Sequence, residues 1–582
     1  MKRSFGVALL ISAITCWGAP PEHRKLAPDV ERMDPSSNVR VIIQWKGDLN
    51  KQHDKVLSRG GTLHFAHRFI KAGTYTLPAS VLQELENDPD VKYIAPDRPV
   101  QSKLDLTAAA INASYAWNLP TPAVGTGIGV AVIDSGVNPG DVNLTTSSGN
   151  GSRVVYSQDF TGGNGNDQYG HGHHISGIIA SNGAATVPAN CWNCTRTFMG
   201  IAPNANIINL RALDANGQAT DSTVIAAIEQ AIALKSTYNI RVINLSLGRP
   251  VYESYQQDPL CQAVEQAWQA GITVVVAAGN SGRDNSYNEQ GYGTVTSPGN
   301  DPYVITVGSM KTEGTPQRTD DLIASYSSKG PTQVDHIVKP DIVAPGNQIV
   351  SLFVNGTLES QYAKTNDVTK GYYLITNPGQ SRKASNQFFT LSGTSMAAGV
   401  VSGAVADVLS VNPNLTPDQI KALIMLTAYK TFPQSSTVTD STGTYTAYYD
   451  IFTVGAGYLD LQAAIQAINN VPPAGVSAIS PSAVYNSATG AVNLSYAPSG
   501  VFTSAAQSAT TASQSIWSAR SIWAASTLNG DQCIGSSQSI WSASTSASSS
   551  QSVAGAQSIW AAQSIWSASS STAESYDNAG EP

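Results

Sequence analysis

The chain has 582 residues, of which 41% are apolar and 13% are charged, and its formal net charge is −8. This length and apolar content are sufficient for a large buried core, so the chain is not disordered throughout. The low charge density and the acidic balance argue against nucleic acid or an anionic membrane surface as the main partner.

Residues 1–19 have the layout of a signal peptide, with Lys2 and Arg3 followed by an apolar stretch and then small residues near Ala19. The apolar stretch is shorter than the roughly 18 residues that a membrane span needs. We therefore expect a secreted, extracellular protein. Cys16 loosely resembles a lipoprotein cleavage signal, which leaves lipidation and attachment to the cell surface as an alternative.

Residues 38–103 have the pattern of a small module that folds by itself. Hydrophobic alternation and turn residues predict the order strand, helix, strand, strand, helix, strand, which is typical of a ferredoxin-like α+β unit. The strands are expected near residues 39–45, 63–69, 73–77 and 91–94, and the helices near residues 51–58 and 79–87.

Residues 106–470 alternate short runs rich in valine and isoleucine with helical patterns. Continuous apolar strands separated by helices predict a doubly wound α/β fold, with a mostly parallel sheet and helices on both faces. In such a sheet, catalytic groups gather at the carboxyl ends of the strands. The expected strands are residues 128–133, 205–210, 242–245, 272–277 and 304–307, and helical patterns cover residues 174–180, 222–235 and 259–270.

Three more helices are expected after residue 394. An apolar, alanine-rich run from Ser395 to Leu409 predicts a buried central helix. The second begins at Thr416-Pro417-Asp418-Gln419, which combines an N-cap threonine, a first-turn proline and a capping-box glutamine. The third covers residues 459–468.

The composition then shifts to serine, alanine, threonine and glycine. We interpret residues 471–512 as a linker and residues 513–582 as a low-complexity tail in which Ser-Ile-Trp recurs. The tail is a disordered spacer, a short repeat in which the Ile-Trp pairs stack, or a contact surface for a partner, a wall polymer or the catalytic domain.

Four cysteines remain after the signal segment, too few for a disulfide scaffold in so long a chain. Cys191 and Cys194 lie close enough for a local disulfide that closes a surface loop, with a redox pair or half of a zinc site as alternatives. Cys261 lies in a helical pattern and is interpreted as a buried small hydrophobic residue.

Four polar residues lie at strand ends or helix starts, where catalytic groups are found in such a sheet. Asp134 follows a strand directly, His171 opens a helical pattern, Asn280 follows another strand, and Ser395 opens the central helix. Each has an ordinary interpretation as a turn or capping residue. His171 also lies in the run Gly170-His171-Gly172-His173-His174, but no carboxylate or cysteine there completes a metal ligand set.

Together the four segments closely resemble the subtilisin-like serine peptidases, or subtilases. The resemblance implies a subtilisin-like fold over residues 106–470, a serine endopeptidase activity, polypeptide substrates and the chain order Asp, His, Ser of the catalytic triad. It is carried by the motifs Val132-Ile133-Asp134-Ser135-Gly136, Gly170-His171-Gly172, Ala278-Gly279-Asn280 and Gly393-Thr394-Ser395-Met396-Ala397.

The chemistry then gives each residue a role. A serine hydroxyl is a weak nucleophile, so His171 would accept the proton of Ser395 and return it to the leaving amine. Asp134 would hold the tautomer of His171 and stabilise its protonated form. The Asn280 amide and the Ser395 N–H would bind the oxyanion. No cofactor or metal is required for this reaction.

The same resemblance implies the substrate-binding residues and an inhibitor. Gly217-Gln218-Ala219 and Ser246-Leu247-Gly248 would be extended edges that pair with a substrate backbone, and Thr296 would narrow the main specificity pocket. Residues 38–103 resemble the family's inhibitory propeptide, with cleavage expected between about Gln101 and Ala110 in a self-processing zymogen. The alternatives are an unrelated small domain for this module and ordinary loops for the substrate edges.

Some positions depart from the family pattern. His173 stands where threonine is usual, which would crowd the cleft or shift the pKa of His171, and Gly399 stands where proline is usual. Calcium loops are not recognisable in residues 181–199, so structural calcium stays unassigned. A catalytically silent subtilase scaffold and a surface-attachment protein that acts through its tail remain alternatives to the enzyme.

Overall fold

The computed structural model describes residues 25–26, 37–47, 49–67, 71–96, 103–146, 148–286, 289–376, 378–486, 491–498, 500–502, 570–573 and 581. The chain divides into two compact units, Met1–Val100 and Gln101–Pro582. The proposed signal peptide and the Ser-Ile-Trp repeats lie outside the described residues. Each unit is described by itself.

The first unit contains an antiparallel sheet with the strand order β2-β3-β1-β4. Trp45, Tyr75 and Ile94 lie in its own apolar core, so the unit has the interior of a separate module. The order of its elements is the predicted one. They are β1 (Asn38–Trp45), α1 (Leu49–Leu57), β2 (Thr62–His67), β3 (Ala72–Pro78), the 3-10 turn η2 (Ala79–Val81), α2 (Leu82–Glu86) and β4 (Val91–Pro96).

The second unit is built on an eight-stranded sheet in the order β13-β12-β11-β9-β5-β7-β6, with β14 paired to β12. All of its pairings are parallel except β12 with β13, which confirms the predicted α/β class. The strands are β5 (Gly129–Asp134), β6 (Val154–Asp159), β7 (Asn206–Arg211), β9 (Ile240–Leu245), β11 (Thr273–Ala277), β12 (Ile305–Lys311), β13 (Leu322–Ile323) and β14 (Ile342–Pro345).

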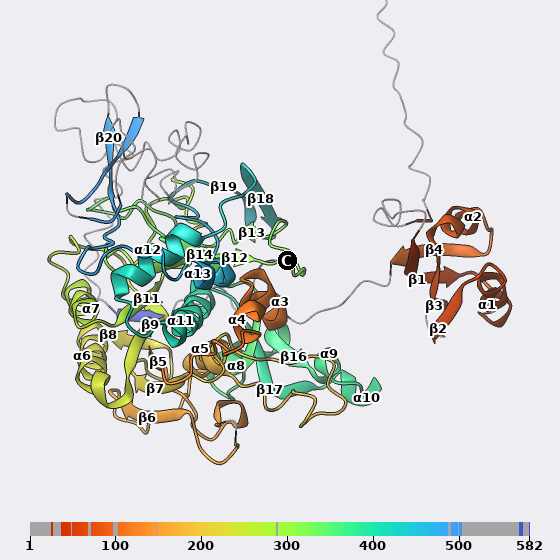
Figure 1. Cartoon of the computed structure of the whole chain (residues 1–582), viewed down its shortest axis with the longest axis horizontal. Coiled ribbons are helices and arrows are strands. Elements are labelled where there is room, and N and C mark those ends of the chain that lie inside the picture. The colour runs from red at the N-terminus through yellow and green to blue at the C-terminus, as the bar shows by residue number, and fades with distance from the viewer. Residues whose placement is uncertain are drawn as a thin grey trace, which may run out of the picture. The chain divides into compact units, whose positions relative to one another are not determined.

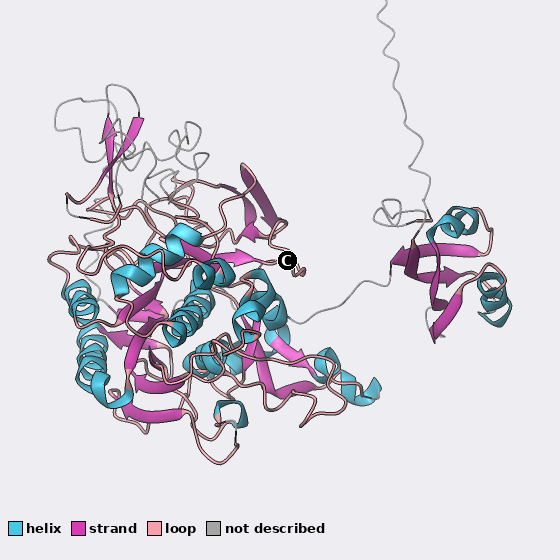
Figure 2. Ribbon diagram, viewed as in Figure 1, coloured by secondary structure: helices cyan, strands magenta, loops and turns pink. Residues whose placement is uncertain are grey.

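Helices cover both faces of this sheet (Figures 1 and 2). Every residue of β5 and β11 is buried, as expected for strands enclosed on two sides. Helices α6 and α7 pack together on one face, and α5 and α11 pack together on the other. The helices are α3 (Lys103–Ala110), α4 (Ala113–Trp117), α5 (His171–Ala180), α6 (Asp221–Tyr238), α7 (Pro259–Gln269), α11 (Thr394–Val411), α12 (Pro417–Thr427) and α13 (Leu461–Gln466).

Helix α11 is the central helix of the core. By length and apolar composition it would pass for a membrane span among the described residues, yet 89% of that window is buried inside the protein. Its small residues let neighbours approach closely, because a Cβ at Gly403 would lie only 2.7 Å from the Cβ of Ile201. Helix α12 begins with the predicted capping box between Thr416 and Gln419.

Smaller elements surround the layers. Helices α8 (Thr357–Asn366), α9 (Lys370–Tyr373) and α10 (Pro378–Ser381) accompany a sheet of β15 (Ile349–Leu352), β17 (Ala384–Leu391) and β16 (Asp367–Thr369). The remaining elements are the 3-10 turn η3 (Val142–Leu144), β8 (Gln218–Thr220), β10 (Leu247–Gly248), the hairpin of β18 (Ser435–Asp440) and β19 (Gly443–Tyr448), and β22 (Ser570–Ala573).

Residues 471–502 differ from the linker that their composition predicts. They contain a hairpin of β20 (Ser482–Asn486) and β21 (Ala491–Ser495). Val501 and Phe502 are buried in one apolar cluster with Val338 and Phe452 of the α/β body. The composition does not predict this contact with the α/β body, because only a few apolar side chains make it and most of the segment consists of serine, proline, glycine and other small or polar residues.

Candidate active site

Asp134 and His171 form a buried pair. Asp134 is the last residue of β5, His171 is the first residue of α5, and both side chains are fully buried. The Nδ1 atom of His171 lies 2.8 Å from Oδ1 and 3.0 Å from Oδ2 of Asp134. A carboxylate can only accept, so Nδ1 carries the proton and Nε2 is the basic nitrogen of the imidazole.

A second buried carboxylate holds this pair in place, and the sequence reasoning missed it. Asp167 accepts hydrogen bonds from the N–H groups of Gly170 (2.8 Å) and His173 (2.9 Å) at the start of α5. The Ser135 hydroxyl donates to Asp167 (2.9 Å) and accepts from the Gly172 N–H (2.9 Å), which ties the end of β5 to α5. The signal available was an aspartate four residues before His171, whose carboxylate could accept from N–H groups at the start of the helix.

The burial of Asp167 has an electrostatic consequence. Burial raises the pKa of Asp167 above its usual range, and the N–H groups of Gly170 and His173 offset only part of this effect. The neighbouring charge of Asp134 acts in the same direction as burial.

Ser395 is the second residue of α11 and is fully buried. Its hydroxyl donates to the Ser246 carbonyl (3.2 Å), and the Ser246 hydroxyl donates to the Ser395 carbonyl (3.0 Å). The position next to a helix N-terminus places unsatisfied N–H groups and a partial positive charge beside the hydroxyl.

Asn280 stands beside the same helix start with its amide in a defined orientation. Its Oδ1 accepts from the Thr394 N–H (2.9 Å) and from the Thr394 hydroxyl (3.2 Å). Its Nδ2 is buried and has no hydrogen-bond partner among the described residues. A buried donor without a partner costs on the order of 1–3 kcal/mol, so this amide suits an acceptor that arrives with a ligand.

Helix α5, which begins with His171, packs against helix α11, which contains Ser395 in its first turn. A Cβ at Gly399 of α11 would lie 3.3 Å from Cγ2 of Ile178 in α5, so the small residue fits this contact. Gly399, at the position where proline is usual in the family, thus lies in the contact between α11 and α5.

The rings of His173 and His174 each have their own hydrogen-bond partners. The N–H of Asn138 donates to Nδ1 of His173 (3.3 Å), and Nε2 of His173 lies 3.1 Å from Oδ2 of Asp141. Nε2 of His174 lies 3.2 Å and 3.1 Å from the carbonyls of Ile349 and Phe389. Burial lowers the pKa of His174 to about 3, so this ring is neutral. The described residues contain no cluster of His, Cys, Asp or Glu suited to a metal ion.

The predicted substrate edges lie in one small sheet. Gly217 has a φ of 74°, and a Cβ there would lie 2.6 Å from the Tyr169 ring, so this turn requires glycine. Gln218 and Ala219 belong to β8, and Leu247 and Gly248 form β10 directly after Ser246. The order of this sheet is β10-β22-β8.

Thr296 lies against the residue that precedes Asn280. Its N–H donates to the Ala278 carbonyl (3.1 Å), and a Cβ at Gly279 would lie 3.1 Å from Cγ2 of Thr296. Thr296 is thereby placed next to the Asn280 turn.

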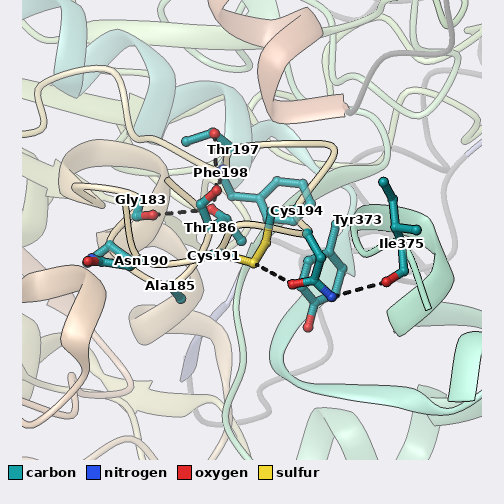
Figure 3. The surroundings of a disulfide bond; sticks show 12 residues. Gly183, Ala185, Thr186, Asn190, Cys191, Cys194, Thr197, Phe198, Tyr373 and Ile375 are labelled. Atoms are coloured by element: carbon teal, nitrogen blue, oxygen red, sulfur yellow. Dashed lines mark hydrogen bonds between the residues drawn. A yellow bond between two sulfur atoms is a disulfide. The ribbon is translucent and has the colours of Figure 1, made fainter. Parts of the chain in front are cut away.

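The cysteines bear out their sequence interpretation. Cys191 and Cys194 form a disulfide in a surface loop (Figure 3). Asn193 between them donates from Nδ2 to the Ile375 carbonyl (3.0 Å), which attaches the loop to the segment after α9. Cys261 is buried, and burial raises the pKa of its thiol well above the usual range, so it is no reactive nucleophile.

Comparison with known proteins agrees with the motifs. The model of a family described as the subtilase family matches residues 125–452. The serine protease AprX of Bacillus subtilis (strain 168) is 34% identical over 352 residues, which cover 59% of this chain and 70% of that protein. Subtilisin E of the same organism is 28% identical over 437 residues, covering 74% and 91%. Alkaline serine exoprotease A of Vibrio alginolyticus is 30% identical over 378 residues, covering 62% and 55%.

Proposed function

The chain belongs to the subtilase family of serine endopeptidases, and from this premise we propose that Asp134, His171 and Ser395 are its catalytic triad and that Asn280 binds the oxyanion. The observation that carries this proposal is the buried Nδ2 of Asn280 beside the first turn of α11. An amide donor next to a helix-start serine is the arrangement that a tetrahedral oxyanion needs.

The reaction uses side chains and one water molecule, and no cofactor takes part. On substrate binding the Ser395 hydroxyl turns from the Ser246 carbonyl to Nε2 of His171 and transfers its proton there while Oγ attacks the substrate carbonyl. Asn280 Nδ2 and the Ser395 N–H stabilise the oxyanion. His171 then protonates the leaving amine, and the acyl-enzyme is hydrolysed by water activated by the same histidine.

The first unit has the role of an inhibitory propeptide in this proposal. Its separate core supports a module that can fold by itself. Leu106 of α3 is buried, and Ala108 and Ala110 pack in the core of the second unit. Cleavage therefore falls before Lys103, because a cut within α3 would divide a packed helix of the mature enzyme.

Secretion as a self-processing zymogen completes the proposal. Residues 1–19 would direct export, and polypeptides outside the cell would be the substrates. Gln218, Ala219, Leu247 and Gly248 would bind the substrate backbone, and Thr296 would shape the specificity pocket. Structural calcium remains unassigned.

Casein hydrolysis tests this function. We expect wild type to cleave casein and to release its first unit, with mass spectrometry showing a new N-terminus before Lys103. Ser395→Ala should lose both activities. Ser410→Ala is the matched control, because this hydroxyl lies on the same helix and donates only to the Asp407 carbonyl. Equal processing and hydrolysis in Ser395→Ala and wild type would contradict the proposal and favour a silent scaffold.

A further inference from the structure

A segment of this chain lies between the two predicted substrate edges. Strand β22 pairs antiparallel with β10, with Thr572 opposite Gly248 and Ala573 opposite Leu247. On its other side β22 pairs antiparallel with β8, with Thr572 opposite Gln218. β22 is thus the middle strand between β8 and β10, and it pairs with both as an added peptide strand would.

The direction of β22 leads toward Ser395. The pairing moves from Gly248 to Leu247 as the chain advances from Thr572 to Ala573, so the strand runs toward Ser246. The Ser246 carbonyl accepts the hydrogen bond of the Ser395 hydroxyl. A backbone laid along β10 in this direction therefore approaches the proposed nucleophile with its carboxyl end.

Glu581 provides a second, independent attachment and is only 1% exposed. Its Oε1 lies 3.0 Å from Nη2 of Arg283 and accepts from the Ser325 N–H (2.8 Å) and the Ser325 hydroxyl. Its carbonyl accepts from Nδ2 of Asn347 (3.0 Å) and Nε2 of Gln348 (2.8 Å), and its N–H donates to Oδ1 of Asn347 (2.9 Å). Charge, side-chain and backbone contacts together make a fitted binding pocket.

This pocket is connected to the loop that precedes Ser395. The Gln348 N–H donates to the Ser392 hydroxyl (2.7 Å), and the Gly393 N–H donates to the Gly346 carbonyl (2.9 Å). Arg283 follows Asn280 by three residues in the sequence. One attachment is therefore beside Ser246 and the other beside the Ser392-Gly393 loop, and the chain joins them through seven residues.

We propose that β22 and Glu581 are two attachment points by which the chain inhibits its own active site, with β22 in the substrate groove and Glu581 in the pocket of Arg283, Ser325, Asn347 and Gln348. The inference rests on the proposed function in taking β8 and β10 as the substrate groove. A tethered segment acts at an effective concentration on the order of millimolar, so it competes with free peptides even when each contact is weak.

Hydrogen exchange of the full chain tests the pairing without catalysis. In a Ser395→Ala chain, Thr572→Pro removes one N–H of β22, and we expect the amides of residues 218–220 and 247–248 to exchange about tenfold faster or more, an effect of about 1.4 kcal/mol. Thr545→Pro, in the same tail, is the matched control and should leave these amides unchanged. Equal exchange in all three chains would overturn the proposal, whether or not the protein proves to be an enzyme.

Kinetics of the processed enzyme test the inhibition. With a short chromogenic peptide amide as substrate, we expect Thr572→Pro and Glu581→Ala to lower the apparent KM by about tenfold with kcat unchanged, because each weakens a competing intramolecular contact. Thr545→Pro should match wild type, and mass spectrometry verifies that each chain retains residue 581. An unchanged KM in both variants would overturn the inhibitory role, whereas absence of hydrolysis in wild type and in both variants would instead refute the proposed function.

Discussion

At the scale of single residues, the chemistry depends on orientation as much as on residue type. Asn280 uses its oxygen to hold the Thr394 N–H, so its Nδ2 has no alternative direction within the turn. His171 uses Nδ1 for Asp134, so Nε2 is the nitrogen that would act as the base in the proposed mechanism. In each residue one polar atom makes a hydrogen bond that orients the other polar atom. A mutation can therefore change one of these two functions and leave the other in place.

Asn280→Asp separates them at the oxyanion site. The carboxylate keeps an acceptor for the Thr394 N–H but loses the Nδ2 donor, so we expect kcat to fall by about 10² to 10³ with KM nearly unchanged, the loss known for removal of such a donor from a subtilisin. Steady-state kinetics on a peptide amide measure it. Asn204→Asp, on an exposed residue, is the control, and a kcat within twofold of wild type for Asn280→Asp would contradict the role.

Asp134→Asn tests whether Asp134 orients His171, the proposed base. An amide in this position favours the wrong tautomer of His171, and we expect kcat to fall by about 10⁴. The double variant Asp134→Asn, Ser395→Ala should be no slower than Ser395→Ala alone, since residues that act as a unit are strongly non-additive. Additive losses in single-turnover assays would show that the two residues act separately.

At the scale of elements, helix α11 buries the carboxyl group of Asp407, which lowers the stability of the folded protein. Asp407 lies in α11, is fully buried, and has no hydrogen-bond partner for either carboxylate oxygen within the described part of the chain. Burial raises the pKa of Asp407 well above its usual range. The folded state therefore binds a proton that the unfolded state releases once the pH exceeds about 4.

Asp407→Asn should remove this pH dependence. The contribution of the protonated carboxyl is intact below pH 4 and declines as pH rises toward the raised pKa, by up to about 1.4 kcal/mol per pH unit. We expect the variant to be more stable than its parent by a margin that widens as pH rises above about 4 toward the raised pKa. Thermal unfolding on a Ser395→Ala background avoids autolysis, and Asp320→Asn, on an exposed residue, should show no widening. A margin independent of pH would contradict the expectation.

At the scale of the whole molecule, the α/β body extends further along the chain than its composition indicates. Phe502, which follows the β20-β21 hairpin, is 2% exposed and belongs to the cluster that joins this segment to the body. Val484, within β20, is 53% exposed. The segment is thus part of the folded enzyme, and the processed protein should retain it.

Phe502→Ala measures this docking. Removing a buried phenylalanine costs about 3–5 kcal/mol, and we expect a fall of several degrees in the thermal midpoint. Val484→Ala, on the exposed side of the hairpin, should change stability by no more than about 0.5 kcal/mol. Equal midpoints for the two variants would show that the segment is a linker after all.

The sequence by itself determined the α/β class, the element order of the first unit, five strands of the large sheet (β5, β7, β9, β11 and β12) and the family. Alternation, capping residues and the residues at strand ends are local features, so Asp134, His171, Asn280 and Ser395 could be recognised from their immediate neighbours. The Cys191–Cys194 disulfide could be predicted for the same reason, because only two residues lie between the two cysteines.

Only the tertiary structure decided which way these groups face and what covers them. The hydrogen bond from Ser135 to Asp167, the contact of His173 with Asp141, the docking of Phe502 and the pairing of β22 with β8 and β10 all join distant parts of the sequence. No periodicity encodes such contacts, because they depend on the packing of elements and on the register between strands rather than on neighbouring residues.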